Sequence, residues 1–142
     1  MADYTLGATV GASCEDAIAR VRALLAEAGF GVLTEIDLAA TLRAKLGVEV
    51  PPQVILGACR PQLAHRALEA DPRIATMLPC NVVITYDTAS RTRVEVLDPA
   101  AMTSFSDASE LAAVAAEARE RLSDMLAALA LQTQGETDAT RA

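Results

Sequence analysis

The chain has 142 residues, of which 52% are hydrophobic and 3% aromatic, and its formal net charge is −7. This length fits a single domain with a sizeable core, whereas the acidic balance and the scarcity of aromatic rings disfavour nucleic acid as a partner. No secretory signal pattern opens the sequence, and no segment reaches the roughly 18–20 apolar residues that span a bilayer, so we expect no membrane partner. Three cysteines cannot all pair within one chain, which favours a reducing cytoplasm.

The chain begins with a predicted strand, a helix and a second strand. Residues 4–10 alternate apolar and polar side chains, a period of two that is typical of a half-buried strand. Ser13 is placed to cap a helix, and Gly29 supplies its left-handed end. Residues 30–36 then form the second predicted strand.

The middle of the chain repeats this alternation. Asp37 is predicted to cap a short helix that ends at Gly47. Residues 53–58 form a third strand, in which the continuous apolar run 54–56 indicates burial on both faces. The following helix, 61–70, opens on a proline at its first position.

A helical turn over 74–78 and a hairpin follow, with strands at 82–86 and 92–97. The second hairpin strand alternates apolar and charged residues, so one face of the sheet is expected to meet water. The predicted fold is therefore α/β (α+β): a mixed, mostly antiparallel five-stranded sheet with helices packed on it, in the order β-α-β-α-β-α-β-β-α.

The longest predicted helix covers about 108–131 and starts at a capping box formed by Asp107 and Glu110. Residues 1–131 form the single predicted domain, and the polar tail 132–142 is expected to be disordered. The apolar stripe of the helix is spaced to pack along a sheet or a partner helix. Its members are Leu111, Val114, Ala118, Leu122, Met125 and Leu129.

Chemistry concentrates between Cys59 and Cys80. Cys59 ends the third strand just before the helix that opens at Pro61, where free backbone N–H groups can stabilise a thiolate. His65, the single histidine, lies about one turn into that helix, and Cys80 begins the next strand. If these two strands pair antiparallel, the cysteines are neighbours; a parallel crossover would separate them to opposite ends of the sheet.

One interpretation is a metal site with Cys59, His65 and Cys80 as ligands for zinc or copper. Three ligands leave a structural site incomplete, so Met102 or Glu35 would supply the fourth. The alternative is that both cysteines are small buried hydrophobic residues and that His65 is an exposed helix residue.

Four further residues carry two interpretations each. Gly57 permits close backbone approach, which suits either tight packing or a ligand pocket. Asn81 can bind a ligand or close the loop before its strand. Glu35 and Asp37 could divide acid and base roles, although capping by Asp37 is the commoner explanation.

Four runs of residues and a final Asp-Pro pair form one pattern. They are Phe30-Gly31-Val32-Leu33-Thr34-Glu35-Ile36-Asp37, Ile55-Leu56-Gly57-Ala58-Cys59, Leu63-Ala64-His65-Arg66-Ala67-Leu68, Leu78-Pro79-Cys80-Asn81-Val82-Val83, and Asp98-Pro99 with Met102. Over about residues 4–103, this pattern resembles a bacterial family known as domain of unknown function number 302. The resemblance implies a small α/β domain that is often a homodimer, and it implies no activity.

Three hypotheses of function follow. The favoured one is a homodimeric binding module for a small ligand or metal near Cys59, His65 and Cys80. The second is a thiol or sulfur-handling protein, with Cys59 as the reactive thiol and His65 as its proton partner. The third is an assembly scaffold built through the C-terminal helix. Whether the chain is an enzyme stays open at this stage.

Overall fold

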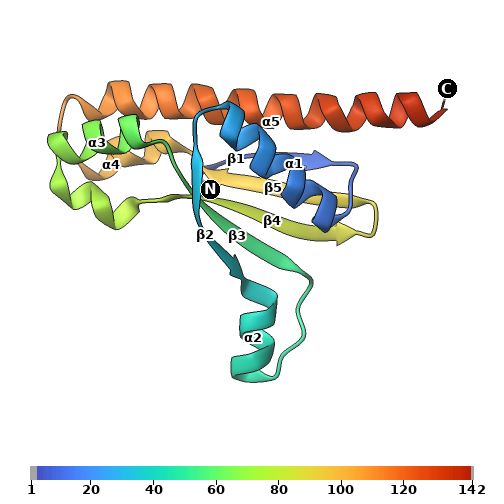
Figure 1. Cartoon of the computed structure of the whole chain (residues 1–142). Helices are drawn as coiled ribbons and strands as arrows, with labels where there is room; N and C mark the ends of the chain where they lie inside the picture. The colour runs from blue at the N-terminus through green and yellow to red at the C-terminus, as the bar shows by residue number, and fades with distance from the viewer. Residues whose placement is uncertain (1–2, 142) are drawn as a thin grey trace.

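The computed structural model describes residues 3–141 of the chain, with side chains over 3–132. A five-stranded sheet runs through it, and every pair of neighbouring strands is antiparallel, which confirms the predicted fold class (Figure 1). The strands, in spatial order, are β1 (Thr5–Val10), β5 (Arg91–Leu97), β4 (Cys80–Thr88), β3 (Gln53–Cys59) and β2 (Gly31–Asp37).

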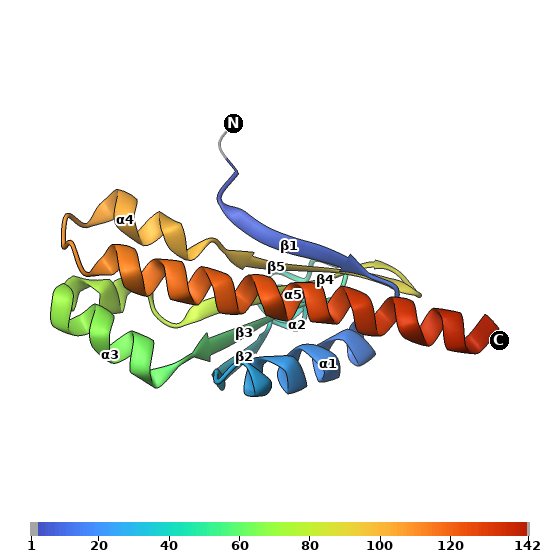
Figure 2. The same ribbon diagram turned by 90° about the horizontal axis from the view of Figure 1, so that it is seen from above.

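Helices α1 (Cys14–Glu27) and α5 (Leu111–Arg141) lie side by side on one face of this sheet (Figure 2). Because side chains alternate along a strand, every second strand residue faces this layer. The main core forms between the sheet and this layer of two helices. Its fully buried larger members are Val10, Val21, Leu25, Leu56, Val82, Ile84, Val94, Val96, Leu122 and Leu129.

The predicted capping residues set the limits of α1. The Ser13 hydroxyl accepts a hydrogen bond from the Asp16 N–H at 3.2 Å, which satisfies one free donor of the first turn. The chain leaves the helix through Gly29, whose φ of 85° lies in the left-handed region that favours glycine. The next strand can therefore begin at once and pair with β3.

Helix α2 (Leu38–Leu46) stands apart from the helix layer. Asp37 caps it by accepting a hydrogen bond from the Ala40 N–H at 2.9 Å, and Gly47 ends it with a φ of 68°. Figure 1 shows α2 projecting from the sheet on the side opposite α1 and α5, and Figure 2 shows it beneath the strands. It packs mainly on β3 and leaves Leu46 exposed.

One end of the sheet is closed by α3 (Pro61–Ala70), a 3₁₀ helix η1 (Pro72–Met77), a second one η2 (Pro99–Ala101) and α4 (Met102–Phe105). These elements pack against the first half of α5 and form a second core. Its buried residues are Leu63, Ala67, Ile74, Met102, Leu111, Val114, Ala115 and Ala118.

Helix α5 corrects the scaffold hypothesis. The stripe from Leu111 to Leu129 is buried in the two cores of its own chain, so it is not available to a partner helix. The helix also continues past its predicted end, to Arg141. The side chains of residues 133–142 lie outside the described part of the chain. The disorder expected for the tail 132–142 therefore stays a prediction. Among the described residues, no helix combines the length and the apolar character needed to cross a membrane.

The opposite face of the sheet has no helix layer in the described chain. The register aligns Ile36, Ile55, Val83 and Glu95 across four strands on this face. The apolar run 54–56 had indicated burial on both faces of β3. Instead, Leu56 is buried under the helices, while Ile55 is only half-buried on the open face.

Candidate functional site

The antiparallel pairing of β3 and β4 brings Cys59 and Cys80 to the same end of the sheet. The register sets Cys80 opposite Ala58, and Cys59 opposite Gly31 on the other side. The two cysteines are therefore neighbours, one position out of register. A disulfide bond needs Cβ atoms about 3.5–4.5 Å apart, a separation found at directly opposite positions, so this placement disfavours a bridge. Both thiols are free.

Both cysteines line a small cavity of about 30 Å³ between the end of the sheet, α3 and α5. Met102, a third sulfur-containing residue, lines the same cavity. A volume of this size holds one water molecule or ion, and it is far below the roughly 300–1,000 Å³ of a typical organic ligand pocket. The remaining lining is almost wholly apolar: Phe30, Ala58, Arg60, Leu63, Ala64, Ala67, Leu78, Val114 and Ala118.

Burial raises the pKa of the Cys80 thiol, and the negative charge of an ionised Cys59 raises it further. Cys80 is consequently a neutral thiol at pH 7. This direction is the reverse of what an activated nucleophile needs. It suits a residue that loses its proton only when a positive ligand arrives.

Arg60 is the one charged residue on the cavity wall. Its Nε is buried, and it is the single such side-chain atom among the described residues without a hydrogen-bond acceptor. The nearest charge is Glu117, whose Oε2 lies 3.8 Å from this Nε, an ion pair rather than a hydrogen bond. Arg60 was not among the predicted site residues, although it stands between Cys59 and Pro61 in the sequence.

His65 does not join the two cysteines. Its side chain is 76% exposed on α3, and its Nδ1 lies 3.3 Å from Glu69 Oε1, one turn further along the helix. Over residues 3–132, no three His, Cys, Asp or Glu side chains come together in a way that could hold a metal ion. The structure thus brings together the pair Cys59 and Cys80 with Met102, and leaves His65 on the surface.

Glu35 also lies away from the cavity. It pairs with Arg22 of α1, with Oε1 2.9 Å from Nη2, and both side chains are exposed. Asp37 is engaged as the cap of α2. These contacts favour the structural interpretation of the two carboxylates.

Packing requires a glycine at position 57. A Cβ atom at this position would lie 2.2 Å from Thr34 Oγ1 and 2.7 Å from Pro79 Cγ. Such distances require the neighbours to move, so glycine is needed for Pro79 and Thr34 to close over β3. The packing alternative thus accounts for Gly57 without a ligand.

A second cavity, of about 220 Å³, adjoins the first through a shared wall of Leu78, Cys80 and Met102. Asn81 and Thr76 add polar groups to its lining. Asn81 therefore stands beside the larger cavity rather than in the apolar one. Cys80 is accessible from both spaces.

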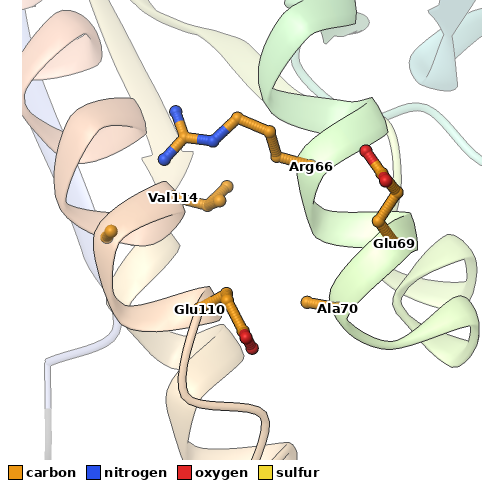
Figure 3. A pocket seen from close by; sticks show the side chains of 6 residues that line it. Arg66, Glu69, Ala70, Glu110 and Val114 are labelled. Atoms are coloured by element: carbon orange, nitrogen blue, oxygen red, sulfur yellow. The ribbon is translucent and has the colours of Figure 1, made fainter.

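A further hollow, of about 530 Å³, is an open groove between α3 and the start of α5. Figure 3 shows Arg66 and Glu69 on the α3 side and Glu110 and Val114 on the α5 side. Arg66 pairs with Glu117 at 3.4 Å, while Glu69 pairs with His65. No cysteine or histidine lines the groove, so it offers charge without a nucleophile or a soft ligand. In the sequence, the only sign of this groove is the pair Arg66 and Glu69, which lie three positions apart on one predicted helix.

The chain matches the family model described as "Domain of unknown function DUF302" over residues 6–129. It is also similar to a solved structure, the crystal structure of uncharacterized conserved protein DUF302 from Bacillus stearothermophilus. The identity is 27%, the TM-score is 0.83, and the match covers 90% of this chain and 99% of the other. No curated protein matches the sequence.

Proposed function

Since the chain belongs to the DUF302 family, whose description assigns no activity, we propose from its own residues that it is a homodimeric binding module for a soft metal ion, copper(I), at Cys59 and Cys80. Met102 serves as a third, thioether ligand. The proposal keeps the predicted metal site and removes His65 from it.

The observation that carries the proposal is that Cys59, Cys80 and Met102 all line one cavity the size of a single ion. Thiolate and thioether sulfur are soft ligands, which select copper(I) over harder metals. Zinc in a structural site takes four donors, and beyond the two cysteines the apolar wall offers no Cys, His or carboxylate. The donor set therefore favours copper(I) among the two metals considered.

Charge balance supports the same assignment. Copper(I) replaces the protons of two thiols, so that one Cu⁺ and two thiols give a dithiolate complex of charge −1 and two released protons. Arg60 lines the same wall, and its positive charge would offset the charge of an anionic complex there. Because the pKa of Cys80 is raised, copper affinity should increase as pH rises through the neutral range.

The thiol-enzyme alternative requires His65 as the proton partner of Cys59. The exposure of His65 and its pairing with Glu69 do not favour that role. A reducing cytoplasm remains the proposed compartment, because free thiols and copper(I) both persist there.

Titration of the reduced protein with copper(I) under anaerobic conditions, against a chromophoric copper(I) chelator, tests the proposal. We expect one tightly held copper per chain in the wild type and in Cys14→Ser, since Cys14 lies on α1 away from the cavity. Cys80→Ser should lower the affinity by at least about tenfold, and Met102→Leu by a smaller factor. Equal affinities for the wild type and Cys80→Ser would contradict the proposal.

A further inference from the structure

We infer that a second copy of this chain docks on the open face of the sheet and is held there by α2. The open face is defined by the side chains of Ile36, Ile55, Val83, Arg93 and Glu95 and their polar neighbours. This inference rests on the proposed homodimer and names the surface through which it forms.

The first argument comes from the pattern of the central strands. Residues 54–56 of β3 and 82–84 of β4 are continuous apolar runs, the pattern of strands buried on both faces. Within one chain, only one of these faces is covered by α1 and α5. The pattern of these two strands therefore suits a cover on the other face, which the described residues of the chain do not supply.

The row formed by Ile36, Ile55 and Val83 crosses the half of this uncovered surface that runs from the central strand β4 to the edge strand β2. The register places these residues side by side on β2, β3 and β4. Ile36 is exposed, and the other two are half-buried. Polar side chains of β1 and β5 border the row on its β4 side, so an apolar area adjoins a polar one, as in many interfaces.

The charges of this region allow two copies to approach. The whole chain carries −7, so most pairs of faces repel each other. On the open face, however, Arg93 pairs with Glu95 at 3.2 Å, and the two charges cancel. In an isologous dimer the same patch meets itself, so Arg93 of one copy can also face Glu95 of the other.

The charges of α2 and the loop after it balance in the same way. Asp37 and Glu49 offset Arg43 and Lys45, and Arg43 Nε lies 3.0 Å from Glu49 Oε1. The region is therefore neutral in a strongly acidic chain. A second copy carries the same excess of negative charge. It therefore meets less electrostatic repulsion at a neutral region than at an acidic one.

Helix α2 supplies the second argument. It has nine residues, and only Ala39 is buried. Isolated helices of fewer than about 12–15 residues are marginal in water, so such a helix needs tertiary packing. Leu46 at the end of α2 is 69% exposed, and Val48 in the loop after it is also exposed. Helix α2 itself lies on the side of the sheet that lacks a helix layer (Figure 1).

The area required for a stable dimer points to both elements acting together. Five strands spaced about 4.8 Å apart and about six residues long give an open face of roughly 500 Å². A standard interface buries about 800 Å² on each partner. The apolar side of α2, laid against the other copy, supplies the remainder.

Light scattering coupled to size-exclusion chromatography tests this interface. We expect the wild type to have twice the mass of one 14.8 kDa chain. Ile55→Glu places a charge at the centre of the face, and Leu46→Glu places one on α2; each should raise the dimer dissociation constant at least about 100-fold and yield monomers. Phe105→Glu, at an exposed position on α4, is the matched control and should remain a dimer.

The outcomes separate the two proposals. A wild-type mass of 14.8 kDa at all concentrations would overturn both the homodimer and the interface. A dimer that persists in Leu46→Glu and Ile55→Glu would overturn this interface alone. If Ile55→Glu fails to fold, Leu46→Glu decides, because its side chain is mainly in water within a single chain.

Discussion

Cys80 and Asp71 show how the surroundings of a single residue determine its protonation. Burial raises the pKa of Cys80, so the thiol keeps its proton. Asp71 has the opposite shift: hydrogen bonds from Arg73, first, and from Ser106 lower the pKa of its carboxyl well below the ordinary range. The Arg73 guanidinium donates to both carboxylate oxygens at 3.1 Å, and the Ser106 hydroxyl donates at 2.7 Å. Asp71 thereby ties η1 to the loop before α5.

Asp71→Asn should lower the melting temperature at pH 7 and weaken its dependence on acid. A depressed pKa in the folded state contributes stability above the ordinary Asp value of about 3.9. That contribution is lost as pH falls from there toward the folded pKa. Thermal unfolding of the wild type and variant between pH 7 and 2 measures it, with Asp124→Asn at an exposed position as the control. Parallel pH curves for the wild type and Asp71→Asn would rule out this role.

Gly57→Ala should destabilise the fold by about 1–3 kcal/mol, because the added Cβ overlaps Thr34 and the rigid ring of Pro79. Gly31→Ala is the matched control: its Cβ would meet only Cys59 O, at an ordinary 3.9 Å. Urea denaturation of both variants gives the comparison. A Gly57→Ala protein as stable as Gly31→Ala would show that the contact relaxes without cost.

At the scale of elements, α5 is the helix on which both cores depend. Its buried stripe contacts the sheet and α1 along one half and α3 and α4 along the other. Truncation before α5 would therefore unfold the chain rather than only alter its assembly. A test of assembly needs surface variants, which is why the interface experiment uses Leu46 and Ile55.

Two leucines of α5 provide a direct test of its role. Leu122 is fully buried, whereas Leu131 is 68% exposed. Leu122→Ala should cost about 2–5 kcal/mol of unfolding free energy, and Leu131→Ala about 0.5 kcal/mol or less. Chemical denaturation of the two variants makes the measurement, and equal losses would show that α5 does not anchor the core.

Most elements could be predicted from local signals. Ser13, Gly29, Asp37 and Gly47 start or end helices through their own hydrogen bonds or backbone angles, which depend on near neighbours in sequence. The antiparallel pairing of β3 with β4 could not be predicted with the same certainty. It depends on where η1 returns the chain after α3, which is a matter of tertiary packing.

In the candidate site, too, residue types could be predicted from the sequence, whereas the positions of the side chains depend on tertiary packing. Cys59, Cys80 and Met102 were identified by residue type, and packing of distant segments brought them to one cavity. His65 shared a helix with that cavity, yet helical periodicity turned it outward, where α3 meets water. Arg60 was overlooked because a single arginine beside a strand carries no pattern until its buried Nε is seen without an acceptor.

At the scale of the whole molecule, the sheet has two faces with different tasks. One face carries the helix layer and the core that stabilise the chain. The other face is open, nearly neutral and apolar across β2, β3 and β4, and we propose that a second copy covers it. The sulfur-lined cavity lies at the end of the sheet closed by α3 and α4, away from α2. Copper binding and dimer formation should therefore vary independently in the variants proposed above.

The most direct test of the proposed copper site is X-ray absorption at the copper edge of the protein loaded with one equivalent of copper(I). We predict a first shell of sulfur alone, contributed by Cys59, Cys80 and Met102. Cys80→Ser should lose part of that shell, and Cys14→Ser should leave it unchanged. A nitrogen or oxygen shell in the wild type, or an identical spectrum for Cys80→Ser, would contradict the account.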